Sequence, residues 1–132
     1  MQSAIQAVST WLHSQLSNLP QKINAVYVEW DFSYLEPNTP REVVLASMDA
    51  FGFEDIKKGT FNCSNQDDLY KLGDFTWEGA CGLRLRKLDY PQQDWTEVLK
   101  NVAAMPDIRE LARNRNLLLL VGYHDDAVYD VS

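Results

Sequence analysis

Hydrophobic and polar positions alternate strictly along residues 23–33. The apolar side of this alternation consists of Val26, Val28, Trp30 and Phe32. The opposite side consists of Tyr27, Glu29, Asp31 and Ser33. Period-two alternation in a stretch rich in β-branched and aromatic residues predicts a strand with one face against the core. The other face is expected to meet solvent or to serve a function.

A different apolar pattern occurs at residues 117–121, where five apolar residues, Leu-Leu-Leu-Leu-Val, follow one another. Strand side chains alternate between the two faces, so this run needs cover on both sides. Polar residues precede it and Gly122 follows it, which favours a strand over a helix. The run predicts the innermost strand of the sheet.

Helical spacing of apolar residues predicts most of the remaining elements. We expect helices at residues 3–19, 39–52, 94 onward and 107–113, with a short one at 64–71 capped by Ser64 or Asn65. Ser3, Thr39 and Asp94 each have Glu or Gln three residues later, which is the spacing of a capping box. The helix at 39–52 has a competitor, because residues 43–45 also have strand character.

Two further extended segments complete the pattern. Residues 75–78 alternate weakly and predict a strand or an extended loop, and residues 81–86 predict a strand with a basic outer face. The 132 residues are the length of one ordinary domain. We therefore expect a single α+β domain over residues 1–132, with a modest, mainly antiparallel or mixed sheet and helices packed against it.

Charge and composition narrow the classes of function. The formal charge of −7 argues against nucleic-acid binding, which needs clustered Lys and Arg. Residues 1–19 lack the pattern of a secretory signal, and no run of 18 apolar residues predicts a membrane span. Cys63 and Cys81 are too few for a disulfide scaffold and are expected to be free thiols. A cytoplasmic protein is the expectation.

Two groups of polar residues are candidates for chemistry. Glu29 and Asp31 lie two residues apart on one strand face, a spacing that suits acid–base work or cation binding, although a solvated strand face has the same pattern. His124, Asp125 and Asp126 follow the predicted innermost strand, where sites often lie, although a plain turn explains them equally. Because neighbours on an extended chain point in opposite directions, we expect His124 and Asp125 not to converge.

Recognised motifs are missing from the sequence. The glycines have neither nucleotide-binding spacing nor a GxSxG elbow, and no HxH or HExxH spacing is present, so no cofactor or metal is predicted. Trp77 and Glu78, in the extended aromatic segment, are candidates for an interface, since exposed Trp is typical of binding surfaces, although packing in or around the core is the commoner role of a tryptophan.

Several segments together resemble a known group of proteins. These are residues 25–28, the Leu-Glu-Pro-Asn-Thr stretch at 35–39, the aromatic segment 75–78, a late helix, and a final apolar strand ending in Asp125 and Asp126. They are similar to small acidic single-domain bacterial proteins, some of which are encoded beside polymorphic or contact-dependent toxins and look like immunity proteins. The resemblance implies a non-enzymatic protein that binds and occludes a basic toxin domain.

Two functions follow as hypotheses. The first is a protein-binding domain, an immunity-type inhibitor of a basic partner, with Glu29, Asp31, Trp77, Glu78, His124, Asp125 and Asp126 as contact residues. The second is a small hydrolase, metal-dependent or acid–base, that uses His124 with nearby carboxylates. An enzyme needs these groups convergent in a cleft with perturbed pKa values, whereas a binding protein needs an exposed patch. The chain is expected to be a monomer or a homodimer.

Overall fold

A computed structural model of the chain describes residues 2–33, 45–56 and 65–132. Its helices are α1 (Ala4–Ser17), α2 (Gln66–Leu69), α3 (Trp95–Ala103) and α4 (Pro106–Asn114), with 3-10 turns η2 (Tyr70–Leu72) and η3 (Lys87–Asp89). Its strands are β1 (Ile23–Ser33), β2 (Leu45–Glu54), β3 (Trp77–Glu78), β4 (Leu83–Arg86), β5 (Leu118–Tyr123) and β6 (Val128–Asp130). The predicted α+β class and mixed sheet are confirmed.

The strands form one open sheet in the order β3-β2-β1-β5-β6, with β4 also paired to β2. The β1–β5 pair is parallel, and the other pairs are antiparallel. β5 is therefore an interior strand, but β1 rather than β5 is the middle strand, which corrects the prediction that residues 117–121 form the innermost one. The parallel β1–β5 pair places the C-terminal ends of both strands at the same end of the sheet.

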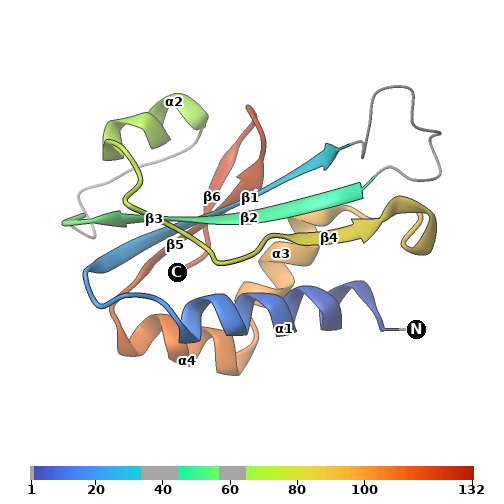
Figure 1. Cartoon of the computed structure of the whole chain (residues 1–132), viewed down its shortest axis with the longest axis horizontal. Coiled ribbons are helices and arrows are strands. Elements are labelled where there is room, and N and C mark those ends of the chain that lie inside the picture. The colour runs from blue at the N-terminus through green and yellow to red at the C-terminus, as the bar shows by residue number, and fades with distance from the viewer. Residues whose placement is uncertain (1, 34–44, 57–64) are drawn as a thin grey trace.

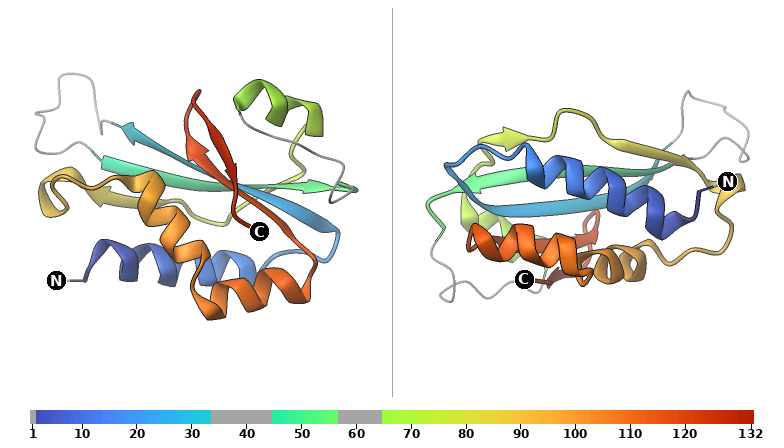
Figure 2. Two further views of the ribbon diagram at one scale, coloured as in Figure 1. Left: turned by 180° about the vertical axis from the view of Figure 1, so that it is seen from behind. Right: turned by 90° about the horizontal axis from the view of Figure 1, so that it is seen from below.

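The two faces of the sheet are covered unequally. Helices α1, α3 and α4 lie on one face, and α2 with η2 is the helical part of the described residues that lies on the other (Figure 1). Seen from below, α1 and the α3–α4 pair run side by side under the strands (Figure 2). Among the described residues, the α2 face therefore has less helical cover than the opposite face.

The apolar run divides between these two layers as predicted. Leu117, Leu119 and Val121 join the main core with α1, α3 and α4. Leu118 and Leu120 join a smaller core under α2, together with Tyr27. Full burial of one such side chain is worth about 1.5–3 kcal/mol, so β5 stabilises both layers.

Helix ends follow the capping signals where the structure describes them. The Ser3 side chain accepts a hydrogen bond from the Gln6 amide, and Asp94 accepts one from the Glu97 amide. Asn65 caps α2, whereas the alternative cap Ser64 lies outside the described residues. In α1, Val8, Leu12 and Leu16 are buried at helical spacing, Trp11 is buried as well, and Ile5 is 42% exposed.

The predicted helix at residues 39–52 is wrong over its described part. β2 runs from Leu45 to Glu54, and the predicted helix start at Thr39 lies outside the described residues. Ten residue pairs join β2 to β1, and alternate residues Ala46, Met48 and Ala50 face the main core. The period-two burial imposed by pairing with β1 outweighs the local helix signals, as tertiary context commonly does.

Candidate functional site

The parallel pairing of β1 with β5 brings the two candidate groups of the sequence together. Glu29 pairs with Gly122, and Trp30 pairs with Tyr123, so His124 emerges beside Glu29. The His124 amide donates to the Trp30 carbonyl at 3.0 Å, which extends the ladder by one bond. The side chains then meet directly, with His124 Nδ1 2.9 Å from Glu29 Oε1.

The turn after β5 adds a second carboxylate. Asp125 has a φ of 59°, and the Asp126 amide donates to the Tyr123 carbonyl at 3.0 Å. This reversal brings Asp125 Oδ2 to 3.2 Å from His124 Nε2. The expectation that His124 and Asp125 would not converge is therefore wrong, because it assumed an extended chain and Asp125 adopts the left-handed region instead.

The surroundings of His124 favour its charged form. Both ring nitrogens face carboxylate oxygens, which when ionised can only accept hydrogen bonds, so both nitrogens are best protonated. The hydrogen bond that the His124 ring donates to Glu29 is the largest cause that raises the pKa of His124. The pKa of Glu29 is also raised, because desolvation of its half-buried carboxyl group outweighs the hydrogen bond and the charge of His124.

Asp31 extends this charged group along β1. Its charge is the largest cause that raises the pKa of Tyr123, and it also acts on both Glu29 and His124. Tyr123 packs against Trp30 with ring centroids 4.4 Å apart, so its phenol is held at this end of the sheet. Four carboxylates lie at this end of the sheet, and we call them the acidic edge: Glu29, Asp31 and Asp125, which act on His124, and Asp126, which acts on Tyr123.

A buried hydrogen bond ties α2 to the sheet next to this edge. Gln66 Nε2 donates to the Tyr27 hydroxyl at 2.5 Å. Gly122 gives the hydroxyl room, since a Cβ built on Gly122 would lie 3.2 Å from it. Asn65 also forms a bridge with Ala127 beyond β5. These contacts fix α2 over the same end of the sheet that carries Glu29 and His124.

Between α2 and the sheet lies a cavity of about 260 Å³. Tyr27, Phe51 and Phe53 of the strands line it from one side, and residues of α2, η2 and the loop that follows line it from the other. Glu29 and His124 also line it, so the charged group opens into an aromatic chamber. The Phe51 and Phe75 ring centroids lie 4.9 Å apart.

No family model, curated protein or solved structure matches this chain. The site must therefore be interpreted from its own geometry.

Within the described ranges, no three His, Cys, Asp or Glu side chains are arranged to hold a metal ion. The same ranges contain no helix with the length and apolar character needed to cross a membrane. Cys81 is a free, exposed thiol, and Cys63 lies outside the described residues.

The structure places Trp77 and Glu78 away from the acidic edge. Both belong to β3, at the opposite side of the sheet from β5 and β6. Trp77 is partly buried and packs against the main core, close to Gly52, where an added Cβ would lie 3.0 Å from its ring. The exposed aromatic residues near His124 are instead Tyr70 and Phe75, which line the cavity. Phe75 belongs to the aromatic segment noticed in the sequence, whereas nothing in the sequence pattern marks Tyr70.

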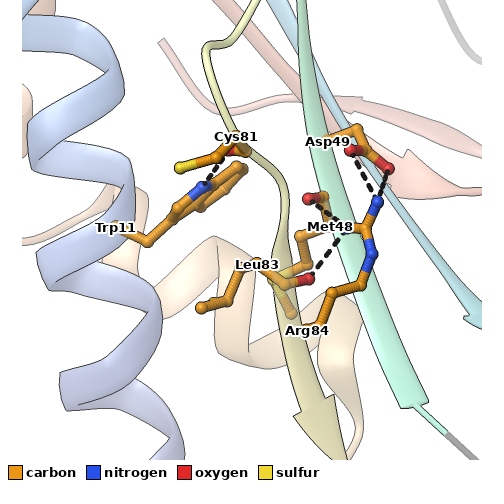
Figure 3. A network of polar contacts seen from close by, with 6 residues as sticks. All are labelled: Trp11, Met48, Asp49, Cys81, Leu83 and Arg84. Carbon is orange, nitrogen blue, oxygen red and sulfur yellow. Dashed lines mark hydrogen bonds and ion pairs between the residues drawn. The ribbon is translucent and has the colours of Figure 1, made fainter.

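A second polar network lies between β2 and β4 and serves the fold. Arg84 donates to the carbonyl groups of Met48 and Leu83 and pairs with Asp49 at 3.1 Å (Figure 3). On the α1 side, the Trp11 indole donates to the Cys81 carbonyl at 2.9 Å (Figure 3). The predicted basic face of residues 81–86 is thus locally neutralised, with Arg84 paired to Asp49 and Arg86 to Asp89.

Proposed function

We propose that this protein acts by binding a basic protein partner through the acidic edge, in the manner of an immunity-type inhibitor. One observation carries the proposal: Glu29, Asp31 and Asp125 converge on His124 at one end of the sheet, beside exposed aromatic residues. Clustered carboxylates speed capture of a basic partner, and neighbouring aromatic side chains supply apolar contact area. The formal charge of −7 acts in the same direction.

The two carboxylates beside His124 support binding over catalysis. A general base needs a ring nitrogen that is free to accept a proton, and here each nitrogen lies within 3.2 Å of a carboxylate oxygen. His124 thus serves to hold Glu29 and Asp125 close together, which concentrates negative charge that would otherwise repel itself. Two ionised carboxylates beside one histidine leave a net negative charge at the acidic edge even when the ring is protonated.

The proposal can be tested with a partner isolated from the host lysate, because binding of that partner should depend on the charge of the acidic edge. The variant D125N/D126N removes two charges and keeps the turn, because Asn also tolerates the positive φ of residue 125. Its matched control, E97Q/E110Q, removes two charges from exposed positions on α3 and α4. We expect a stoichiometric complex that weakens with salt, is lost in D125N/D126N and survives in E97Q/E110Q. Equal binding by both variants would contradict the proposal.

An acid–base enzyme is the second candidate function. The raised pKa of Glu29 and its position on a cavity beside His124 favour it, since catalytic carboxyl groups commonly have raised pKa values. Movement of exposed Asp125 would release one nitrogen of His124. A hydrolysis screen with E29Q as the negative control tests this function: turnover by the wild type that E29Q lacks would establish it.

A further inference from the structure

We propose that the cavity between α2 and the sheet receives an arginine side chain of the basic partner, with Glu29 as its counter-ion. The inference rests on the proposed function, and it names the partner group that would anchor the complex. Three features of the cavity support it: its aromatic walls, the signs of its charges and its size.

Five aromatic side chains line the cavity. Tyr27, Phe51 and Phe53 lie on the sheet side, and Tyr70 and Phe75 lie on the open side. Tyr70 is 67% exposed and Phe75 is 50% exposed, although both are large apolar groups. A planar guanidinium stacks favourably on such rings, and an incoming side chain would cover rings that are otherwise left to solvent.

The charged side chains that line the cavity favour the binding of a cation. Glu29 and Asp74 supply carboxylates, and His124 is the only cationic group among the described residues of the lining. His124 Nδ1 faces Glu29 Oε1 and the Tyr27 hydroxyl also hydrogen-bonds to Glu29, yet a carboxylate offers about four acceptor positions on two oxygens. Glu29 therefore retains capacity to accept from a guanidinium while it contacts His124. Arginine fits better than lysine because its fork of donors matches a carboxylate.

The size of the cavity suits a side chain. Sites for drug-sized ligands are commonly about 300–1,000 Å³, and this cavity is about 260 Å³. It opens beside the acidic edge, where a basic partner would already be held. An arginine on that partner could then enter between Phe75 and Glu29 without a change in the backbone.

His124 competes with the arginine for Glu29. Replacement by a neutral residue, as in H124Q, should therefore strengthen cation binding, and a rise in pH that deprotonates His124 should do the same. The other titratable groups that face the pair or line the cavity are Asp31 and Tyr27 on β1, Tyr70 in η2, Asp74 after η2, Asp125 in the turn and Tyr123 on β5.

A titration of the full chain with n-butylguanidinium, followed by two-dimensional NMR at constant ionic strength, tests the inference. The neutral isostere n-butylurea and the anion pentanoate serve as comparison probes. We expect n-butylguanidinium to bind with a Kd of order 1 mM, typical of a small fragment, and to shift resonances of cavity residues. The other two probes should bind at least about tenfold more weakly, a ratio in line with the loss of one charged hydrogen bond.

Variants locate the bound cation. E29Q should weaken n-butylguanidinium binding at least about tenfold. F75L should weaken it about threefold, as expected for one exposed cation–π contact, and it changes a rim residue that the fold does not need buried. E110Q, which removes the same charge as E29Q from the opposite side of the molecule, should leave binding unchanged.

The outcomes separate this inference from the proposed function. Equal binding of n-butylguanidinium and n-butylurea, or n-butylguanidinium binding that neither E29Q nor F75L weakens, would overturn the arginine site. The salt-dependent complex and its loss in D125N/D126N would still support the acidic edge in that case. If n-butylguanidinium binds as expected but D125N/D126N keeps the partner, the cavity stands as a cation site and the acidic edge fails as the recognition surface.

Discussion

The substitution G122A should destabilise the fold at the point where β1, β5 and β6 meet. A Cβ on Gly122 would lie 2.6 Å from the Ala127 carbonyl oxygen, 3.2 Å from the Tyr27 hydroxyl and 3.4 Å from the Val128 Cα. The closest atom belongs to the backbone, so β6 must shift. Overpacking of this kind costs about 1–3 kcal/mol.

An opposing effect reduces that cost. Gly122 does not have a positive φ, so alanine adopts its backbone conformation without strain and lowers the entropy of the unfolded chain, which is worth about 0.4–1 kcal/mol. The net loss in the free energy of unfolding is therefore about 1–2 kcal/mol, which for a chain of this size lowers Tm by about 3–8 °C. Urea unfolding followed by tryptophan fluorescence measures it, with an unchanged m value.

The double variant Y27F/G122A identifies which contact is responsible. Y27F alone removes the acceptor of buried Gln66 and should cost about 1–2 kcal/mol. Because the Ala127 oxygen is the nearer obstacle, removal of the Tyr27 hydroxyl should not rescue G122A, and the coupling energy should stay under about 0.5 kcal/mol. A G122A protein as stable as the wild type, or a full rescue by Y27F, would refute this account of the β5–β6 packing.

Three further predictions concern other parts of the structure. D94A removes the side-chain cap of α3 and should lower the free energy of unfolding by about 1 kcal/mol in urea titrations, whereas D94N should restore most of it. R115K should cost about 2 kcal/mol, because the Arg115 guanidinium donates to the carbonyl groups of Leu19, Pro20 and Ile23 and an ammonium cannot reach all three; a loss below about 0.5 kcal/mol would contradict this. The raised pKa of His124 means that the folded state binds more protons than the unfolded state, so its contribution to stability is complete below about pH 6.5 and is lost as the pH rises through the folded-state value. The stability of the wild type relative to H124Q, from urea midpoints between about pH 5.5 and 8.5, should therefore fall as the pH rises.

Local sequence patterns correctly predicted the elements in which buried residues recur at one regular spacing along the chain. The alternation at residues 23–33 matches β1 in full, and the apolar run ending at Val121 is covered on both faces, as expected. The helix predicted through residues 45–52 failed because pairing with β1, a contact distant in sequence, determines its conformation. Local spacing carries no information about that partner.

The candidate site likewise combines residues that the sequence indicates with contacts that it does not specify. Glu29 and His124 were each noticed in the sequence, but their contact depends on the parallel register of β1 and β5, which no local pattern specifies. The approach of Asp125 depends on one residue with a positive φ. The aromatic cavity arises where α2 folds over the sheet, a placement set by Leu69 and the Gln66–Tyr27 hydrogen bond.

The protonation of His124 tests the account most directly, because it distinguishes a charge-holding histidine from a catalytic base. Nitrogen-15 NMR of the imidazole ring, recorded as a function of pH on the wild type and on E29Q, measures it. The structure predicts an imidazole pKa that lies above its ordinary value and falls in E29Q, with both nitrogens protonated below that pKa. A pKa at or below the ordinary value that E29Q leaves unchanged would contradict the account and favour acid–base chemistry at this site.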